Sequence, residues 1–207
     1  MNKYSIDFEQ IIQVYYNFGS ETDHLLYNSK NLKFLIKIDA FSGKVNLFNT
    51  EDIIKSNKFI EQNIVTNGVD KIAFSNDSKF IFMPDVFGNL KQYIISHDNK
   101  LYQNFANKGR NKVTVMCLGE YGKHLITANS NGFIKVYNIN YDKKPQKINY
   151  LQIPYSEIDT HHMTPIKSII YIPKDNYLYT CDIEGNLKKF TCNFRKNRKL
   201  LVWYKKL

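Results

Sequence analysis

The chain has 207 residues and a mass of 24.4 kDa, enough for one domain with a sizeable core and too little for two. Hydrophobic residues make up 43% and charged residues 23%, close to globular averages, which excludes global disorder. A net charge of +10 is typical of proteins that bind nucleic acid or an acidic membrane. Only three of the 29 basic residues are arginine, however, and this lysine excess is typical of an AT-rich eukaryotic genome. We therefore favour a surface of solvated lysine over a functional basic face.

The cysteines and the chain start bear on the compartment. Cys117, Cys181 and Cys192 cannot all pair and none has CxxC spacing, which indicates a reducing environment. The first ten residues carry acids where a signal peptide needs an apolar core, and no run approaches the ~18 apolar residues of a membrane span. We expect a soluble intracellular protein, with the cytoplasm favoured over the nucleus.

Residues 1–23 precede the recognisable pattern and are expected to form an N-terminal extension. Their apolar residues fit one face of a helix as well as the alternation of a strand, so both structures stay open.

From residue 24 onward one pattern occurs four times. Each copy has an apolar strand, a polar turn ending in glycine, and a second strand with an aromatic residue five positions after the glycine. The copies are 33–50, 79–95, 123–139 and 176–191. Their turn glycines are Gly43, Gly88, Gly132 and Gly185, spaced by 45, 44 and 53 residues, and their aromatic residues are Phe48, Tyr93, Tyr137 and Phe190. The period predicts one structural unit copied four times.

The turn chemistry predicts a hairpin in each copy, because Gly and Asn tolerate the positive φ of a tight turn. A further apolar strand is expected before each hairpin, at 24–34, 70–80, 112–124 and 165–177. Another is expected after it, at 58–64, 101–106, 149–155 and 199–207. Runs such as 168–172 do not alternate, so both faces of the strand should be covered. Small sheets stacked around an axis provide that cover, which predicts an all-β propeller of four four-stranded antiparallel blades. The expected blades are 24–64, 65–106, 107–155 and 156–207.

The segment 126–139 resembles the WD-repeat family, with Asn131-Gly132 where Asp-Gly is usual and Tyr137-Asn138 where Trp-Asp is usual. His162 resembles the family's histidine ahead of a blade. The family's tryptophan is missing from every copy, and its turn aspartate is replaced by Ser42, Phe87, Asn131 and Glu184. The resemblance implies a propeller with a partial His, Ser/Thr, Asp, Trp network. It also implies a non-catalytic scaffold that docks other proteins through its loop faces.

No catalytic motif, P-loop or metal-ligand spacing is found in the sequence, so we expect no catalytic residue, no metal, no cofactor and no small-molecule substrate, and not an enzyme. His161 and His162 are adjacent and should point to opposite sides of the chain. Asp85, Asp182 and Glu184 fall in the hairpin turns, where carboxylates commonly accept hydrogen bonds from backbone amides.

Basic residues gather in the loops expected at one end of the blades. The candidate partner-binding residues are Lys143, Lys144, Lys147, Arg195, Lys196, Arg198 and Lys199. They would face an acidic protein segment. The alternative function is a basic propeller that binds nucleic acid or anionic lipid head groups through these loops.

Four blades are the lower limit for a closed propeller. Either the chain closes alone as a tight ring, or it is an open arc completed by self-association or within a larger assembly. We favour the arc.

Overall fold

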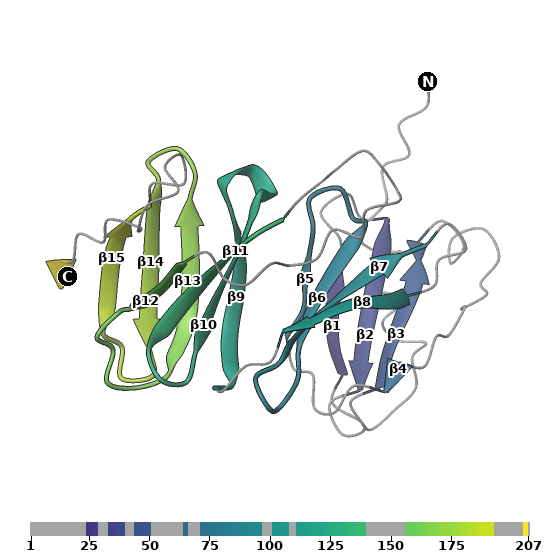
Figure 1. Ribbon diagram of the computed structural model, residues 1–207, viewed down its shortest axis with the longest axis horizontal. Helices are drawn as coiled ribbons and strands as arrows, with labels where there is room; N and C mark the ends of the chain where they lie inside the picture. The colour runs from purple at the N-terminus through teal and green to yellow at the C-terminus, as the bar shows by residue number, and fades with distance from the viewer. Residues whose placement is uncertain are drawn as a thin grey trace.

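The computed structural model describes residues 24–28, 33–39, 44–50, 64–65, 71–96, 101–107, 111–139, 156–192 and 205–206 (Figure 1). Within these ranges the chain forms four antiparallel sheets of four strands, with almost no helix. In every sheet the strands lie side by side in chain order. The expected all-β architecture of antiparallel sheets is therefore confirmed.

The strand bounds are as follows. The first sheet contains β1 (His24–Asn28), β2 (Phe34–Asp39), β3 (Lys44–Asn49) and β4 (Ile64–Val65). The second contains β5 (Ala73–Phe74), β6 (Phe80–Pro84), β7 (Leu90–Ile95) and β8 (Leu101–Asn107). The third contains β9 (Val113–Gly119), β10 (His124–Asn129), β11 (Phe133–Asn138) and β12 (Ser156–Asp159), with the 3-10 turn η1 (Glu120–Gly122) between β9 and β10. The fourth contains β13 (Ile166–Ile172), β14 (Tyr177–Asp182), β15 (Leu187–Thr191) and β16 (Lys205–Lys206).

Two strands differ from the expected positions. The strand that pairs with β11 is Ser156–Asp159, which belongs to the third sheet, and the expected segment 149–155 lies outside the described residues. In the first sheet the described fourth strand is only Ile64–Val65, at the end of the expected 58–64. Apolar residues are frequent in the sequence before and after both of these outer strands. The apolar pattern alone therefore does not select which residues pair with the neighbouring strand.

The hairpin turns have the backbone conformation that their glycines permit. Gly88, Gly132 and Gly185 have φ of +83°, +78° and +83°, a region that residues with a Cβ avoid. Gly43 lies outside the described residues.

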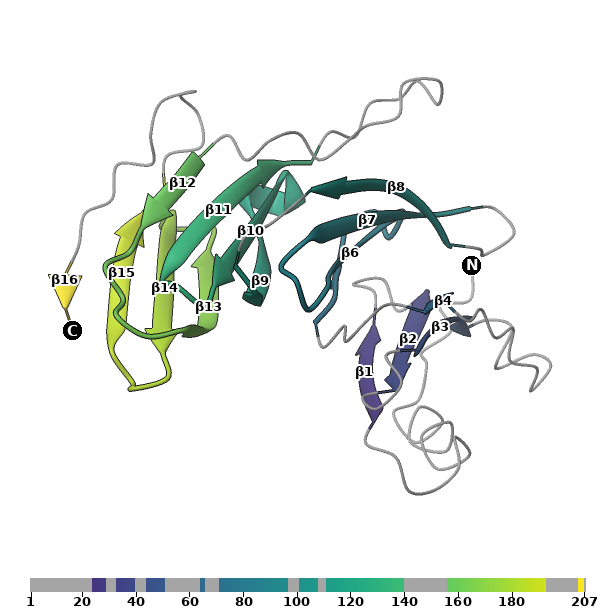
Figure 2. The same ribbon diagram turned by 60° about the horizontal axis from the view of Figure 1, so that its bottom comes forward.

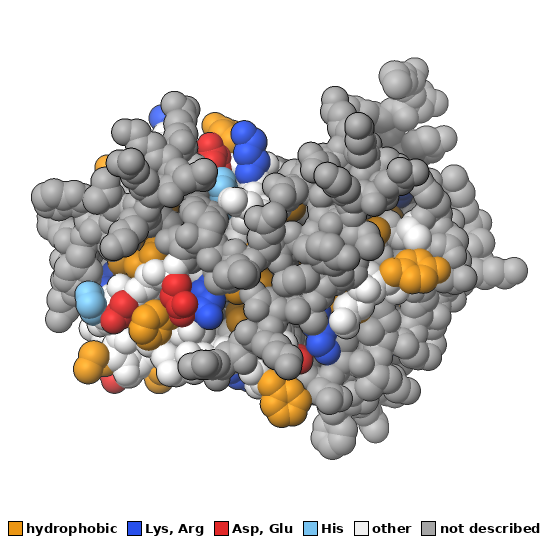
Figure 3. Space-filling model, in the orientation of Figure 1, with side chains coloured by type: hydrophobic (Ala, Val, Ile, Leu, Met, Phe, Trp, Pro, Cys, Tyr) orange, Lys and Arg blue, Asp and Glu red, His pale blue; other side chains and the backbone are white. Residues whose placement is uncertain are grey.

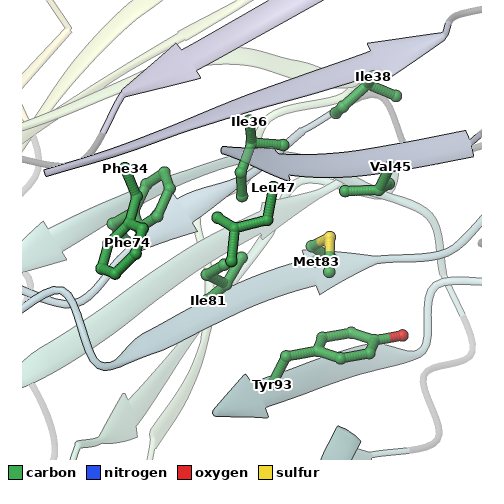
Figure 4. Close-up of a cluster of buried hydrophobic side chains, with 9 residues drawn as sticks. All are labelled: Phe34, Ile36, Ile38, Val45, Leu47, Phe74, Ile81, Met83 and Tyr93. Carbon is green, nitrogen blue, oxygen red and sulfur yellow. The ribbon is translucent and has the colours of Figure 1, made fainter. Parts of the chain in front are cut away.

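The sheets stack face to face, and the core lies between them. We call the face of a sheet that looks toward the next sheet in the chain its forward face, and the opposite one its rear face. Between the first and second sheets, nine buried side chains form one cluster (Figure 4): Phe34, Ile36, Ile38, Val45, Leu47, Phe74, Ile81, Met83 and Tyr93. Between the second and third sheets lie Phe82, Leu90, Leu125, Tyr137 and Ile139. Between the third and fourth sheets lie Ile126, Ala128, Ile134, Val136, Ile166, Ile169, Leu178, Phe190 and Cys192.

The first strands of neighbouring sheets lie on the inside of the array, where β9 contacts both β5 and β13. In both views the first and the fourth sheets lie at opposite ends of the molecule (Figures 1 and 2). Every sheet between them therefore has a neighbour on each face. In the part of the chain that the structure describes, no helix is long and apolar enough to cross a membrane.

Candidate interaction face

The described hairpin turns share one capping device, a side-chain oxygen three residues before the glycine. Asp182 Oδ1 accepts hydrogen bonds from the backbone N–H groups of Glu184 and Asn186, at 3.0 and 2.9 Å. Asp85 Oδ1 and Asn129 Oδ1 each accept the equivalent pair of bonds in their own turns, at 2.9–3.0 Å. This bonding was expected of Asp85 and Asp182. Because the backbone is fixed in the same way in all three turns, differences between their exposed side chains are not required by the fold.

A buried polar cluster joins the loop before β13 to the fourth sheet. The His162 Nδ1 lies 2.9 Å from Asp182 Oδ2, and its Nε2 lies 2.8 Å from Thr180 Oγ1. Burial lowers the pKa of His162, which keeps the ring neutral near pH 7. The neutral ring donates its Nδ1–H to the carboxylate and accepts the Thr180 hydroxyl.

The carboxylate of this cluster stays ionised although it is buried. Burial alone would raise the pKa of Asp182, but hydrogen bonds from the side chain and backbone of Asn186 and from His162 hold it well below its usual range. His162, Thr180 and Asp182 therefore form one hydrogen-bonded cluster. Its acid is Asp182, two residues before the Glu184 position at which the resemblance places it. The sequence could have indicated this position, because an Asp or Asn stands three residues before the turn glycine in three of the four copies.

A buried lysine completes the connection. Lys188 is 5% exposed, and its ammonium group donates to the backbone oxygens of Thr160 and His161, at 3.0 and 2.6 Å. The Thr160 side chain in turn donates to the backbone oxygen of Gly132 in the third sheet. The loop is thus held from both sides at the junction of two sheets.

The order Asp182, His162, Thr180 matches the acid, base and hydroxyl of a hydrolytic triad. The His162 side chain is 0% and the Asp182 side chain 1% exposed, and Thr180 is 1% exposed. A nucleophile must reach a substrate, and this hydroxyl is enclosed by protein. The arrangement therefore orients the loop and does not present a reactive oxygen.

Exposed apolar side chains gather at the same end of the sheets. We call this end, made of the turns 85–89, 129–132 and 182–186 and the loops before β9 and β13, the turn face. Phe87 is 67% exposed, Met163 95% and Ile183 56%. In the view of Figure 3, hydrophobic side chains (orange) stand out along the lower edge beside both acidic (red) and basic (blue) ones. Sequence reasoning missed them, although the third turn has the polar pair Ser130-Asn131 where the second has Val86-Phe87.

The candidate partner-binding residues named from sequence all lie outside the described residues: Lys143, Lys144, Lys147, Arg195, Lys196, Arg198 and Lys199. Of the two adjacent histidines, His162 is buried and His161 is exposed. The Nδ1 of His161 lies 3.4 Å from Oδ2 of Asp159. Among the described residues no group of three or more His, Cys, Asp or Glu side chains is placed to hold a metal ion.

Similar proteins are found by structure and not by sequence. No protein-family model matches the sequence, and a search of curated proteins finds no match. A functionally unknown protein from Desulfotomaculum acetoxidans matches with a TM-score of 0.66 and 13% identity, over 91% of this chain and 56% of its own. A protein from Bacteroides uniformis, provisionally assigned as a 6-phosphogluconolactonase, matches with a TM-score of 0.65 and 15% identity, over 88% and 52%. The β-propeller domain of Cps50 (Swd1) from Myceliophteria thermophila matches with a TM-score of 0.58 and 8% identity, over 78% and 52%.

These likenesses define the class of the fold, which is that of a β-propeller. The chain spans about half the length of each of these structures. The expectation that the chain is not an enzyme is corrected, because two of the similar structures carry the provisional 6-phosphogluconolactonase assignment. The lack of a sequence motif was the wrong ground for that exclusion, since this fold is shared by proteins assigned as enzymes.

Proposed function

We propose that the chain is a protein-interaction scaffold of the WD-repeat type that docks partner proteins through its turn face. The observation that carries this proposal is that Phe87, Met163 and Ile183, in the turns and loops at one end of the sheets, are all more than half exposed. Large apolar side chains that point from loops into water favour burial against a partner, at about 1.5–3 kcal/mol for each one that becomes fully covered.

The surroundings of these side chains indicate what kind of partner fits. Two acidic residues belong to the same end of the sheets: Glu184 follows Ile183 in the fourth turn, and Asp159, whose side chain is 49% exposed, ends β12. The exposed apolar side chains favour a partner segment with apolar anchors. The likeness to the Cps50 (Swd1) propeller domain supports a scaffold role, as does the hairpin pattern of 126–139.

The third turn is the template for the test variant, because its backbone is capped in the same way and its exposed side chains are polar. A variant carrying Phe87→Asn, Met163→Ser and Ile183→Ser gives the turn face the polarity of Ser130-Asn131. The matched control is Tyr121→Asn, which removes a side chain that is 77% exposed on η1, at the opposite end of the sheets. Asn tolerates the positive φ of 53° at this position.

Both variants and the wild type are used as bait in native extract, and captured proteins are quantified by mass spectrometry. We expect partners that are retained by the wild type and the control and lost from the turn-face variant. If the turn-face variant has the wild-type melting temperature and captures the same proteins in the same amounts, the proposal is wrong.

A second candidate, binding of nucleic acid or anionic lipid head groups, is favoured by the net charge of +10. It assigns the contact to the basic residues 143–147 and 195–199. Retention on heparin and on anionic phospholipid vesicles that falls steeply between 50 and 200 mM salt, roughly in proportion to the phosphates neutralised, supports it. Reversal of charge at Arg195, Lys196 and Arg198 should then abolish retention, and unchanged retention would rule this candidate out.

A further inference from the structure

The methionines of the chain differ widely in exposure. Of the four, Met1 lies outside the described residues. Met83 is 0% exposed in the core between the first and second sheets, and Met116 is partly buried against the core between the second and third. Met163, in the loop before β13, is 95% exposed. Because oxidation of a thioether requires contact with the oxidant, Met163 should react first among the described methionines.

The main chain around Met163 is held by contacts that do not use its side chain. The Lys188 ammonium group donates to the backbone oxygens of Thr160 and His161, at 3.0 and 2.6 Å. The ring of His162, the residue directly before Met163, is bonded to the fourth sheet through both of its nitrogens, at 2.9 and 2.8 Å. A chemical change at the Met163 sulfur should therefore leave the loop in place.

We propose that Met163 is a selective and reversible oxidation site, and that its sulfoxide weakens docking at the turn face. The effect on docking rests on the proposed function, whereas the oxidation itself does not. The oxidant is a hydroperoxide, such as hydrogen peroxide. The thioether sulfur attacks one peroxide oxygen, the O–O bond breaks and an S–O bond forms, so that sulfur loses two electrons. The proton of the attacked oxygen passes to the leaving hydroxide, which departs as water.

The reverse step needs a thiol-dependent methionine sulfoxide reductase. It removes the oxygen as water while two thiols become a disulfide, which returns two electrons to the sulfur. Reversal matters for the role of the site, because it allows the loop to alternate between an apolar and a polar side chain. The same oxygen on Met83 would lie in the core and would destabilise the fold.

The sulfoxide changes the turn face at a point that the proposed partner covers. Met163 shares this end of the sheets with the exposed Phe87 and Ile183. An unoxidised methionine is flexible and polarizable and adapts to an apolar partner surface. The sulfoxide oxygen is a hydrogen-bond acceptor that gives up its water when the partner covers it. Burial of one such group without a new hydrogen bond weakens binding about tenfold or more.

The oxidation is measured first, in the full chain without a partner. The purified protein is treated with hydrogen peroxide, and the sulfoxide at each methionine is followed over time by peptide mass spectrometry. We expect the sulfoxide to form at least about tenfold faster at Met163 than at Met83 or Met116. The melting temperature should stay unchanged while Met163 alone is oxidised, and the two epimer-specific reductases should restore the thioether. Similar rates at the three positions, a lower melting temperature or failure of the reversal would contradict the proposal.

The effect on docking is measured with a matched variant. Met163→Leu has an apolar side chain of similar size that peroxide does not oxidise. Wild type and variant are used as bait in native extract before and after the peroxide treatment, and the amount of each partner after treatment is divided by the amount before. We expect this ratio to fall about tenfold for the wild type, to recover after reductase treatment, and to stay near one for Met163→Leu. Cys181 and the other oxidisable side chains are the same in both chains, so the difference between them reports Met163.

Each outcome bears on one of the two proposals. An equal fall for the wild type and Met163→Leu would assign the effect to another residue and refute the switch, as would unchanged capture by the oxidised wild type. If the unoxidised wild type captures no more than the turn-face variant, the proposed function fails and the effect on docking fails with it. The oxidation rates and their reversal then still decide whether Met163 is the selective site.

Discussion

The third and fourth sheets are two copies of one pattern in different surroundings. Both have a capped hairpin with a glycine at positive φ and a buried aromatic residue on the rear face. Among the described residues, the third sheet has buried apolar clusters on both faces, and the fourth has one on its rear face. The residues at equivalent forward positions differ accordingly: Ile126 and Val136 are aliphatic, and Tyr179 and Lys189 carry polar ends. The local pattern therefore sets the fold of each sheet, while the side chains of its forward face depend on what covers that face.

The junction between these sheets also contains a buried ionic group, the carboxylate of Asp182. Asp182 caps its own hairpin through Oδ1 and binds His162 through Oδ2. At the equivalent position the third sheet has Asn129, which caps its turn in the same way without a charge. Asn129 therefore shows the capping role alone, whereas Asp182 combines capping with the contact to His162.

The largest effect is expected from Asp182→Ala. It removes the turn cap and leaves the His162 Nδ1–H buried without its acceptor, so unfolding should become easier by about 3–5 kcal/mol. Asp182→Asn, which copies Asn129, should lose only about 1–2 kcal/mol. Urea denaturation of the full chain measures both. Equal losses in the two variants would show that the contact to His162, and not capping, is what matters.

The turn glycines provide the next comparison. Gly132→Ala combines backbone strain with a Cβ only 2.4 Å from the His162 oxygen, so we expect a loss of about 3 kcal/mol. Gly185→Ala has the strain alone and should lose about 1 kcal/mol. Denaturation midpoints of the two variants test this difference. If Gly185→Ala is as harmful as Gly132→Ala, residues of the chain itself pack on the fourth turn.

The buried histidine predicts a pH dependence. The pKa of His162 is lowered by burial below the model-peptide value of 6.5, so the unfolded chain binds the proton more readily than the folded chain. Its contribution to stability is present above pH 6.5 and decreases as the pH falls, by at most about 1.4 kcal/mol per pH unit.

Denaturation between pH 7.5 and 5 measures this slope. Burial lowers the pKa of His124 as well, so His162→Gln should reduce the slope and His124→Gln should reduce it separately. A wild-type slope that His162→Gln leaves unchanged would contradict the assignment of a neutral, buried ring.

Much of the fold could be predicted from the sequence, because the repeated unit contains its own turn chemistry. A glycine with an aromatic residue five positions later is a local signal, and it locates both strands of each hairpin. The position of β12 could not be predicted in this way, since a short outer strand is selected by pairing with β11 and not by its own pattern.

The candidate site was less accessible to sequence reasoning. The acid of the buried network was sought at Glu184, the family position, whereas the structure uses the capping residue Asp182. The exposure of Phe87 and Ile183 depends on the turn geometry, because an apolar residue in a sequence does not reveal whether anything covers it. The basic clusters at 143–147 and 195–199 stay a prediction.

The smallest effect is expected on β13, where neighbouring residues test the two faces of one strand. Ile169 is 6% exposed and packs against the third sheet, and Ile170 is 59% exposed on the forward face. Ile169→Thr places a hydroxyl in the core and should lose about 1–3 kcal/mol. Ile170→Thr keeps the β-branched shape in water and should change the free energy of unfolding by less than about 0.5 kcal/mol. Denaturation of the isolated chain provides both values. A large loss from Ile170→Thr would mean that this face is covered within the isolated chain.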